Sequence, residues 1–167
     1  MDTFFEQIIR VRRTKAQLAG VVGIWFLAFI LAIADFIFLI SSPLATFGLL
    51  ILFGIGWGAW KLTSLSSIEY EYIFTNGDLD IDKIIAKSSR KRVASISCTR
   101  AERYGKFNPS ARPSGSVQKV LTFCETNEPN AYFIVAPMKN EGNVMIVFAP
   151  DDRVRGAIEK AVPRIAL

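Results

Sequence analysis

Two long apolar runs stand out in the pattern of hydrophobic and polar positions along the chain. Residues 18–40 contain a single charge, Asp35, and residues 44–62 contain only Lys61, close to their end. At about 1.5 Å of rise per residue, each run has about the length that a helix needs to cross a membrane. Residues 41–43 end the first helix because proline lacks an N–H and disfavours helix at the residue before it. The pattern therefore predicts a transmembrane helical hairpin, with spans at 18–40 and 44–62.

The charges that flank these runs predict the orientation of the hairpin. The connecting turn at 41–43 has no Lys or Arg, whereas basic residues precede the first span and close the second: Arg10, Arg12, Arg13, Lys15 and Lys61. Basic loops stay in the cytoplasm. We therefore expect a cell-membrane protein with two spans, an extracytoplasmic turn and both termini in the cytoplasm.

Residues 1–17 form a basic, amphipathic N-terminal segment. Thr3 and Glu6 have the spacing of a helix capping box. The apolar residues of the segment share one side at helical spacing: Phe4, Phe5, Ile8 and Ile9. We expect a helix that lies on the inner leaflet, or alternatively a simple extension of the first span into the cytoplasm.

Small residues mark candidate helix contacts within the hairpin. Gly54 and Gly58 form a Gly-x-x-x-Gly pair, and Gly20 and Gly23 lie at the matching depth of the first span. Small residues let helix backbones approach each other, so the two pairs are expected to meet. The alternative is that Gly54 and Gly58 contact a second copy of the chain in a homo-oligomer.

After a short polar linker at 63–67, the hydrophobic period changes from helical spacing to two, which is typical of strands. Residues 68–74 and 79–85 flank Asn76-Gly77, a dipeptide suited to a type I′ hairpin turn. Four further strands are expected at 93–98, 117–124, 131–136 and 144–148. Pro150-Asp151-Asp152 then begins an amphipathic helix that ends at Pro163.

About six strands followed by one helix predict an antiparallel β domain at 68–167. A strongly curved sheet with a helix closing one end is the pleckstrin-homology-like (PH-like) architecture, and an α+β sandwich is the alternative. The fold class is thus an α+β membrane protein with an N-terminal transmembrane hairpin and a PH-like domain.

Four segments carry a resemblance to a known family: MDTF at 1–4, IEYEY at 68–72, TNGDLDIDKIIA at 75–86 and VFAP at 147–150. Through them the chain resembles small, uncharacterised membrane proteins of Gram-positive bacteria that have a two-helix hairpin and a cytoplasmic PH-like domain. The resemblance implies the same architecture. It brings no assigned activity and no catalytic motif.

Composition argues against an enzyme. The chain has no histidine, which is the commonest general base and transition-metal ligand. It also lacks a nucleophile elbow and a phosphate-binding glycine loop. Cys98 and Cys124 are expected to be reduced and buried. We expect no cofactor and no metal, because Asp78-x-Asp80-x-Asp82 has Lys83 where a calcium loop needs glycine.

Basic residues cluster in two places of the domain. Lys87, Arg90, Lys91 and Arg92 form a basic turn between the second and third strands, and Arg100, Arg103, Lys106 and Arg112 follow in and near a long loop at 104–116. Folded together, they would present one positive surface to anionic lipid headgroups. The alternative is an ordinary solvated surface. The net charge of +5 is small, and without a recognition motif we expect no nucleic acid partner.

Together these patterns lead to a non-enzymatic integral membrane protein whose cytoplasmic domain binds a partner protein or helps to assemble a complex. Its expected partners are membrane lipids and a protein. The first alternative is a binder or sensor of anionic lipids through the basic turn. The second is a transport component that uses Asp35, although that carboxylate could also reach the outer headgroups or be neutral.

Overall fold

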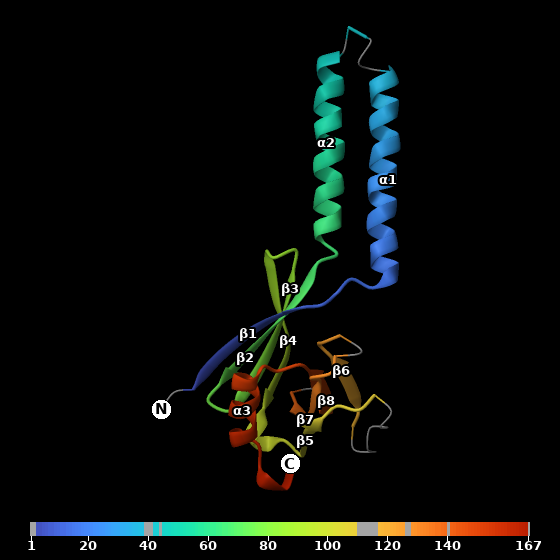
Figure 1. Cartoon of the computed structure of the whole chain (residues 1–167). Coiled ribbons are helices and arrows are strands. Elements are labelled where there is room, and N and C mark those ends of the chain that lie inside the picture. The colour runs from blue at the N-terminus through green and yellow to red at the C-terminus, as the bar shows by residue number, and fades with distance from the viewer. Residues whose placement is uncertain are drawn as a thin grey trace. The chain divides into compact units, whose positions relative to one another are not determined.

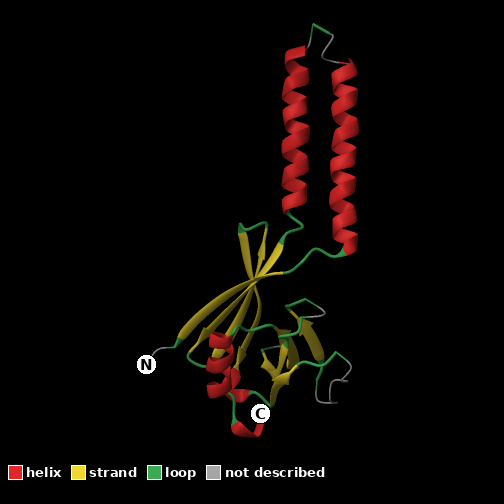
Figure 2. Ribbon diagram, viewed as in Figure 1, coloured by secondary structure: helices red, strands yellow, loops and turns green. Residues whose placement is uncertain are grey.

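The computed structural model describes residues 3–38, 42–43, 45–109, 117–125, 128–139 and 141–166. These residues form three α-helices, two short 3₁₀ helices and eight β-strands in two sheets (Figures 1 and 2). The chain divides into two units, which we describe separately. The helical unit is Arg12–Ile68, and the β unit combines Met1–Val11 with Glu69–Leu167.

The helical unit is a hairpin of α1 (Lys15–Phe38) and α2 (Ala45–Ser64), which lie in the two predicted apolar runs. Both helices are long and apolar enough to cross a membrane. A capping box begins α1: the Thr14 hydroxyl accepts the Gln17 N–H at 3.2 Å, and the Gln17 side chain accepts the Thr14 N–H at 2.9 Å. The guanidinium of Arg13, just before α1, donates to the backbone carbonyl of Thr63 in the last turn of α2, so this hydrogen bond joins the two ends of the hairpin.

Between α1 and α2, Gly54 and Gly58 line a cavity with Ile24, Ala28 and Leu31 of α1, and not with Gly20 and Gly23. Gly20 and Gly23 are exposed, and a Cβ added to any of Gly20, Gly23, Gly54 or Gly58 would meet nothing within 4 Å. The buried residues of the hairpin are instead Asp35 on α1 and Gly48 and Ala59 on α2. The close glycine contact expected within the hairpin is therefore absent from this unit, and the homo-oligomer alternative stays a prediction.

The first sheet has the order β1–β2–β3–β4. Its strands are β1 (Phe4–Arg10), β2 (Ile68–Thr75), β3 (Asp78–Ile85) and β4 (Ser89–Ser97). β1 and β2 are antiparallel and pair along the whole length of β1, from Phe4 opposite Thr75 to Arg10 opposite Glu69. The helical hairpin is therefore an insertion in the connection between two paired strands.

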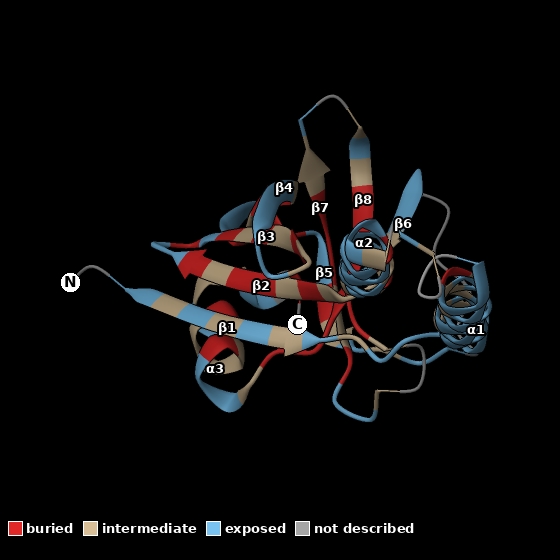
Figure 3. Ribbon diagram, turned by 90° about the horizontal axis from the view of Figure 1, so that it is seen from above, coloured by how far each residue is buried: buried red, intermediate tan, exposed pale blue. Residues whose placement is uncertain are grey.

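The interfacial helix predicted for the N-terminal segment is wrong, because residues 4–10 are strand β1. Alternate residues of β1 are exposed and half-buried, as Figure 3 shows. Phe5 and Ile9 pack against the core, whereas Phe4 and Ile8 point outward and are 59% and 50% exposed. The capping-box pattern at Thr3 therefore caps no helix.

The β2–β3 hairpin is confirmed. Asn76 and Gly77 both have positive φ, of 49° and 98°, as a type I′ turn requires. Further along, a bulge between β3 and β4 shifts the register after Ile81. It changes which residues of β3 face the core, so that Ile84 is buried where simple alternation indicates Ile85.

The second sheet has the order β5–β7–β8–β6. Its strands are β5 (Arg103–Lys106), β6 (Lys119–Thr122), β7 (Tyr132–Met138) and β8 (Gly142–Phe148). β6 runs parallel to β8, whereas the other pairs are antiparallel. The described residues thus hold eight strands rather than about six, since β1 and β5 were not expected, and the β unit is not wholly antiparallel.

Both sheets and α3 (Asp152–Ala161) share one hydrophobic core (Figure 3). The remaining elements are two 3₁₀ helices, η1 (Cys98–Arg100) and η2 (Arg164–Ala166). The predicted C-terminal helix is confirmed. Asp151 caps it by accepting the Val154 N–H at 2.8 Å. Val154, Ile158 and Val162 are buried in the core.

Two side chains of the first sheet fix the segment that leads into α3. The buried Tyr72 hydroxyl donates to the Phe123 carbonyl at 2.8 Å and accepts the Ala149 N–H at 3.3 Å. The Gln7 amide on β1 donates to the Ala149 carbonyl at 3.2 Å and accepts the Asp151 N–H at 2.7 Å. β1 is therefore part of the scaffold that positions α3.

Candidate functional site

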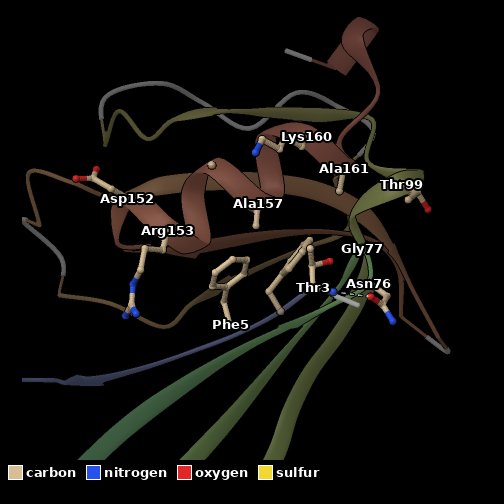
Figure 4. Close-up of a pocket in the computed structure, with 12 residues that line it drawn as sticks. Thr3, Phe5, Asn76, Gly77, Thr99, Asp152, Arg153, Ala157, Lys160 and Ala161 are labelled. Atoms are coloured by element: carbon tan, nitrogen blue, oxygen red, sulfur yellow. Dashed lines mark hydrogen bonds between the residues drawn. The ribbon is translucent and has the colours of Figure 1, made fainter. Parts of the chain in front are cut away.

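A groove of about 730 Å³ lies on the β unit between α3 and the β2–β3 turn (Figure 4). Four parts of the chain surround it: one face of α3, the start of β1, the turn itself and Thr99 in η1. The residues lining the groove are Thr3, Phe5, Phe74, Asn76, Gly77, Thr99, Asp152, Arg153, Gly156, Ala157, Lys160 and Ala161.

One wall of the groove is a face of α3 made mostly of small residues. Gly156, Ala157 and Ala161 line it, with Arg153 and Lys160 at its two ends. Ala157 and Ala161 also pack against the core, so this face adjoins the buried face of α3 that carries Val154 and Ile158. A Cβ added to Gly156 would meet nothing within 4 Å, so the groove is open beside this residue.

The floor and the opposite wall are held by strand pairing. Phe74 is buried in the core and Phe5 packs against it. Thr3 and Asn76 are tied twice, because the Thr3 N–H donates to the Asn76 side chain at 3.0 Å and the Asn76 N–H donates to the Thr3 carbonyl at 3.1 Å. Figure 4 shows this pair beside Gly77. The wall is thus a fixed turn.

Two of the three charged residues that line the groove form ion pairs, and the third, Lys160, forms none among the described residues. Arg153 forms an ion pair with Asp151 at 3.0 Å, and Asp152 pairs with Arg155 at 3.1 Å. Lys160 is exposed and has no ion pair among the described residues. The groove therefore has an apolar floor and one cation that is free to meet an acidic group.

The pKa of the Asp151 carboxyl is lowered. Partial burial opposes its charged form, but the hydrogen bonds from Val154 and Arg153 and the charge of Arg153 outweigh that effect. Asp151 therefore stays ionised as a cap at the positive end of α3.

The basic turn predicted from the sequence is largely engaged in ion pairs. Arg90 contacts the buried Glu71 at 2.9 Å, and Arg92 pairs with both Asp80 and Asp82. The exposed basic residues without an ion pair in this part of the described chain are Lys87 and Lys91. The turn is therefore less positive than its sequence indicates.

Glu71 is an unusual member of this network because its side chain is fully buried on β2. Burial, together with a hydrogen bond to the Glu6 carboxyl, raises the pKa of Glu71 against the opposing charge of Arg90. Arg90 thus has a structural partner within the sheet.

The structure does not gather all the predicted basic residues in one place. Lys87 to Arg92 lie around the start of β4, whereas Arg100 follows its end, in η1. At about 3.3 Å per residue, the nine residues of β4 separate these two ends by roughly 25–30 Å. Arg103 and Lys106 lie on β5, in the other sheet, and the Arg103 guanidinium lies 5.8 Å from the centre of the Phe133 ring. Arg112 lies outside the described residues.

The aspartates at 78, 80 and 82 are not arranged around a metal. Arg92 takes the two carboxylates at 80 and 82, and no group of His, Cys, Asp or Glu in the described part of the chain has the geometry of a metal site.

Both cysteines are free and buried. Burial raises the pKa of Cys98 to about 12 and that of Cys124 to about 11. The thiolate form is therefore scarce at neutral pH, which is the opposite of what an activated nucleophile needs.

A meander of four strands, a second sheet packed against it and a C-terminal helix define the class of PH-like domains. The chain belongs to the bacterial PH-like domain family DUF6106, whose model matches residues 1–167. No curated protein and no solved structure matches the chain.

Sequence reasoning did not find the groove. The sequence pattern predicts a helix on the membrane for Thr3 and Phe5, and it gives no sign that they lie beside α3 and the β2–β3 turn. The pattern of α3 did carry a signal, because Gly156, Ala157 and Ala161 are small residues that alternate with the larger apolar residues Val154, Ile158 and Val162.

Proposed function

We propose that this chain is a non-enzymatic membrane protein whose PH-like β unit binds a partner protein through the groove beside α3. The observation that carries the proposal is the groove itself, with its apolar floor, its wall of small residues and the unpaired Lys160. The cysteine thiols disfavour their reactive form, and neither cysteine lines the groove.

Membrane insertion of α1 and α2 is the first part of the proposal. It is supported by their length and hydropathy and by the large apolar side chains exposed on both helices. Phe26, Phe53 and Trp57 are examples, at 64%, 74% and 57% exposure. Lipid would cover such a surface, whereas water would not. Basic residues at the open end of the hairpin favour a cytoplasmic location for the β unit.

Binding of a protein segment in the groove is the second part. Gly156, Ala157 and Ala161 leave room for a backbone to approach α3, and Phe5 and Phe74 offer apolar contact to a side chain. Lys160 favours an acidic residue on the partner. The expected ligand is therefore a peptide segment that combines an apolar anchor with a carboxylate.

The alternative of an anionic lipid site at the basic turn is disfavoured by the pairing of Arg90 and Arg92 with acidic residues. Only Lys87 and Lys91 remain for headgroups there. Neutralising Lys87 and Lys91 distinguishes the two functions. If the basic turn binds lipid, binding to anionic vesicles should weaken. If the groove binds a protein, the partner should stay bound.

The groove can be tested by photo-cross-linking. A photoreactive amino acid at Gly156 of the full chain, where an added Cβ meets nothing within 4 Å, should give a discrete protein adduct when the chain is expressed in its native bacterium. Lys160→Glu should reduce that adduct about tenfold, because a carboxylate would then face the acidic partner. Lys139→Glu is the matched control, since it makes the same charge change at an exposed residue outside the groove. Equal loss in both variants, or no adduct at all, would contradict the proposal.

A further inference from the structure

Asp35 on α1 is a buried acidic residue, and one of its carboxylate oxygens has no hydrogen-bond partner among the described residues. It is 8% exposed, although it lies only three residues before the end of the helix at Phe38. Its Oδ1 atom is inaccessible and accepts no hydrogen bond from the described residues. This oxygen therefore does not reach outward to headgroups or water, where an acidic residue near a helix end would be solvated at little cost.

Asp35 lines a cavity of about 280 Å³. The other described residues around the cavity are all apolar: Phe29, Ala32, Ile33 and Phe36 on α1, and Leu52 on α2. A buried water needs about two to four polar partners, and a metal ion needs several oxygen ligands. One carboxylate provides neither. The cavity suits a ligand that is apolar over most of its length and cationic at one end.

The hairpin cannot supply that cation itself. Lys15 begins α1, 20 residues before Asp35, which corresponds to about 30 Å along the helix. Lys61 is in the last turn of α2, at the end that pairs with the start of α1. Within the described hairpin, no Lys or Arg lies near the depth of Asp35.

We propose that Asp35 binds a lysine or arginine side chain from the transmembrane helix of a partner protein. The stem of either side chain is apolar, and its charged end would neutralise the carboxylate in a medium where an unpaired charge is strongly disfavoured. Phe29, Ile33 and Phe36 are 63%, 44% and 63% exposed, so they can pack against the same partner helix. The inference rests on the proposed membrane insertion of α1 and α2.

The test uses the full chain reconstituted in neutral phosphatidylcholine vesicles. The probe is a labelled leucine helix of about 20 residues with one lysine about one turn from its end, and its twin has leucine at that position. Energy transfer to the labelled protein reports association. We expect the lysine peptide to bind about tenfold more tightly than its twin, and Asp35→Asn to remove the difference. Asp35→Lys should reverse the preference toward a peptide that carries aspartate at the same depth.

A control distinguishes this inference from the membrane proposal. Alkaline washing of the vesicles removes peripheral proteins and leaves inserted ones. If the wild-type chain is washed away, membrane insertion fails and the inference fails with it. If the chain stays but binds both peptides equally, or if Asp35→Asn keeps the preference for lysine, only the Asp35 inference is overturned.

Discussion

Two glycines of the β unit show how the same residue type serves opposite needs. Gly156 is in the interior of α3 with open space where a Cβ would be, whereas Gly77 has a φ of +98° and a Cβ there would lie 3.2 Å from Thr99 Cγ2. The backbone conformation at Gly156 suits any residue, whereas the positive φ at Gly77 favours glycine.

Replacing these glycines should therefore have opposite effects on stability. Gly156→Ala should raise the free energy of unfolding by up to about 1 kcal/mol, because alanine is the better helix former and nothing obstructs it. Gly77→Ala should lower it by more than about 1 kcal/mol. Denaturant unfolding of the purified full chain measures both. Two changes of the same sign would contradict this account.

The Tyr72 hydroxyl is a second residue whose effect can be isolated. Tyr72→Phe leaves the buried Phe123 carbonyl and Ala149 N–H without this partner and should lower the free energy of unfolding by about 1–3 kcal/mol. Tyr70→Phe makes the same change two residues away on β2, at a half-buried residue with no hydroxyl hydrogen bond in the described structure. That control should change the free energy of unfolding by less than about 0.5 kcal/mol.

The raised pKa of Glu71 should make the free energy of unfolding depend on pH. Its pKa is raised in the folded state, so the folded chain binds this proton more tightly than the unfolded chain does. The free energy of unfolding of the wild type should therefore rise, relative to that of Glu71→Gln, as the pH falls through the raised pKa towards the ordinary value of a glutamate. Parallel stability curves for the two proteins would show that Glu71 does not titrate in this way.

At the scale of elements, the sequence predicted those whose pattern has a single interpretation. The Asn76-Gly77 hairpin and the helix capped by Asp151 were found because their turn and cap chemistry is local. β1 was missed because Phe4, Phe5, Ile8 and Ile9 fit a helix face and also supply both faces of a strand. The capping-box pattern at Thr3 and Glu6 begins no helix, whereas the same pattern at Thr14 and Gln17 begins α1.

Other elements depend on contacts that no local pattern encodes. β5 has four residues, of which only Tyr104 is buried, so it becomes a strand by pairing with β7. β6 was expected, but its parallel pairing with β8 is a property of the sheet as a whole. The groove was hidden for the same reason, since its wall joins the start of β1 to a turn more than 70 residues away.

The role of β1 leads to a prediction about the β unit. A chain that joins residues 3–10 to residues 69–167 through Asn-Gly should fold without the hairpin, because Arg10 and Glu69 are already paired neighbours. Residues 64–167 alone should be unstable, since they lack β1 and the two hydrogen bonds of Gln7. Urea unfolding followed by circular dichroism compares the two. A cooperative transition of equal midpoint in both would show that β1 is dispensable.

For the whole molecule, the proposed topology can be examined with the chain's own chemistry. The native cysteines are buried with raised pKa values, so they should react slowly with maleimides. In intact cells, an impermeant maleimide should label Ser42→Cys in the turn between α1 and α2. It should label Lys87→Cys, in the exposed β3–β4 turn, only after the membrane is opened. The reverse pattern would place the β unit outside.

The insertion of the hairpin between β1 and β2 has a consequence for biogenesis. β1 leaves the ribosome first, yet its partner strand is made only after both helices. If only one helix crossed the membrane, β1 and β2 would lie on opposite sides and could never form the pairs from Phe4–Thr75 to Arg10–Glu69. A complete sheet then requires both helices to be inserted or neither. Chains with only one inserted helix would keep β1 and β2 unpaired. Quality-control proteases could then recognise and degrade them.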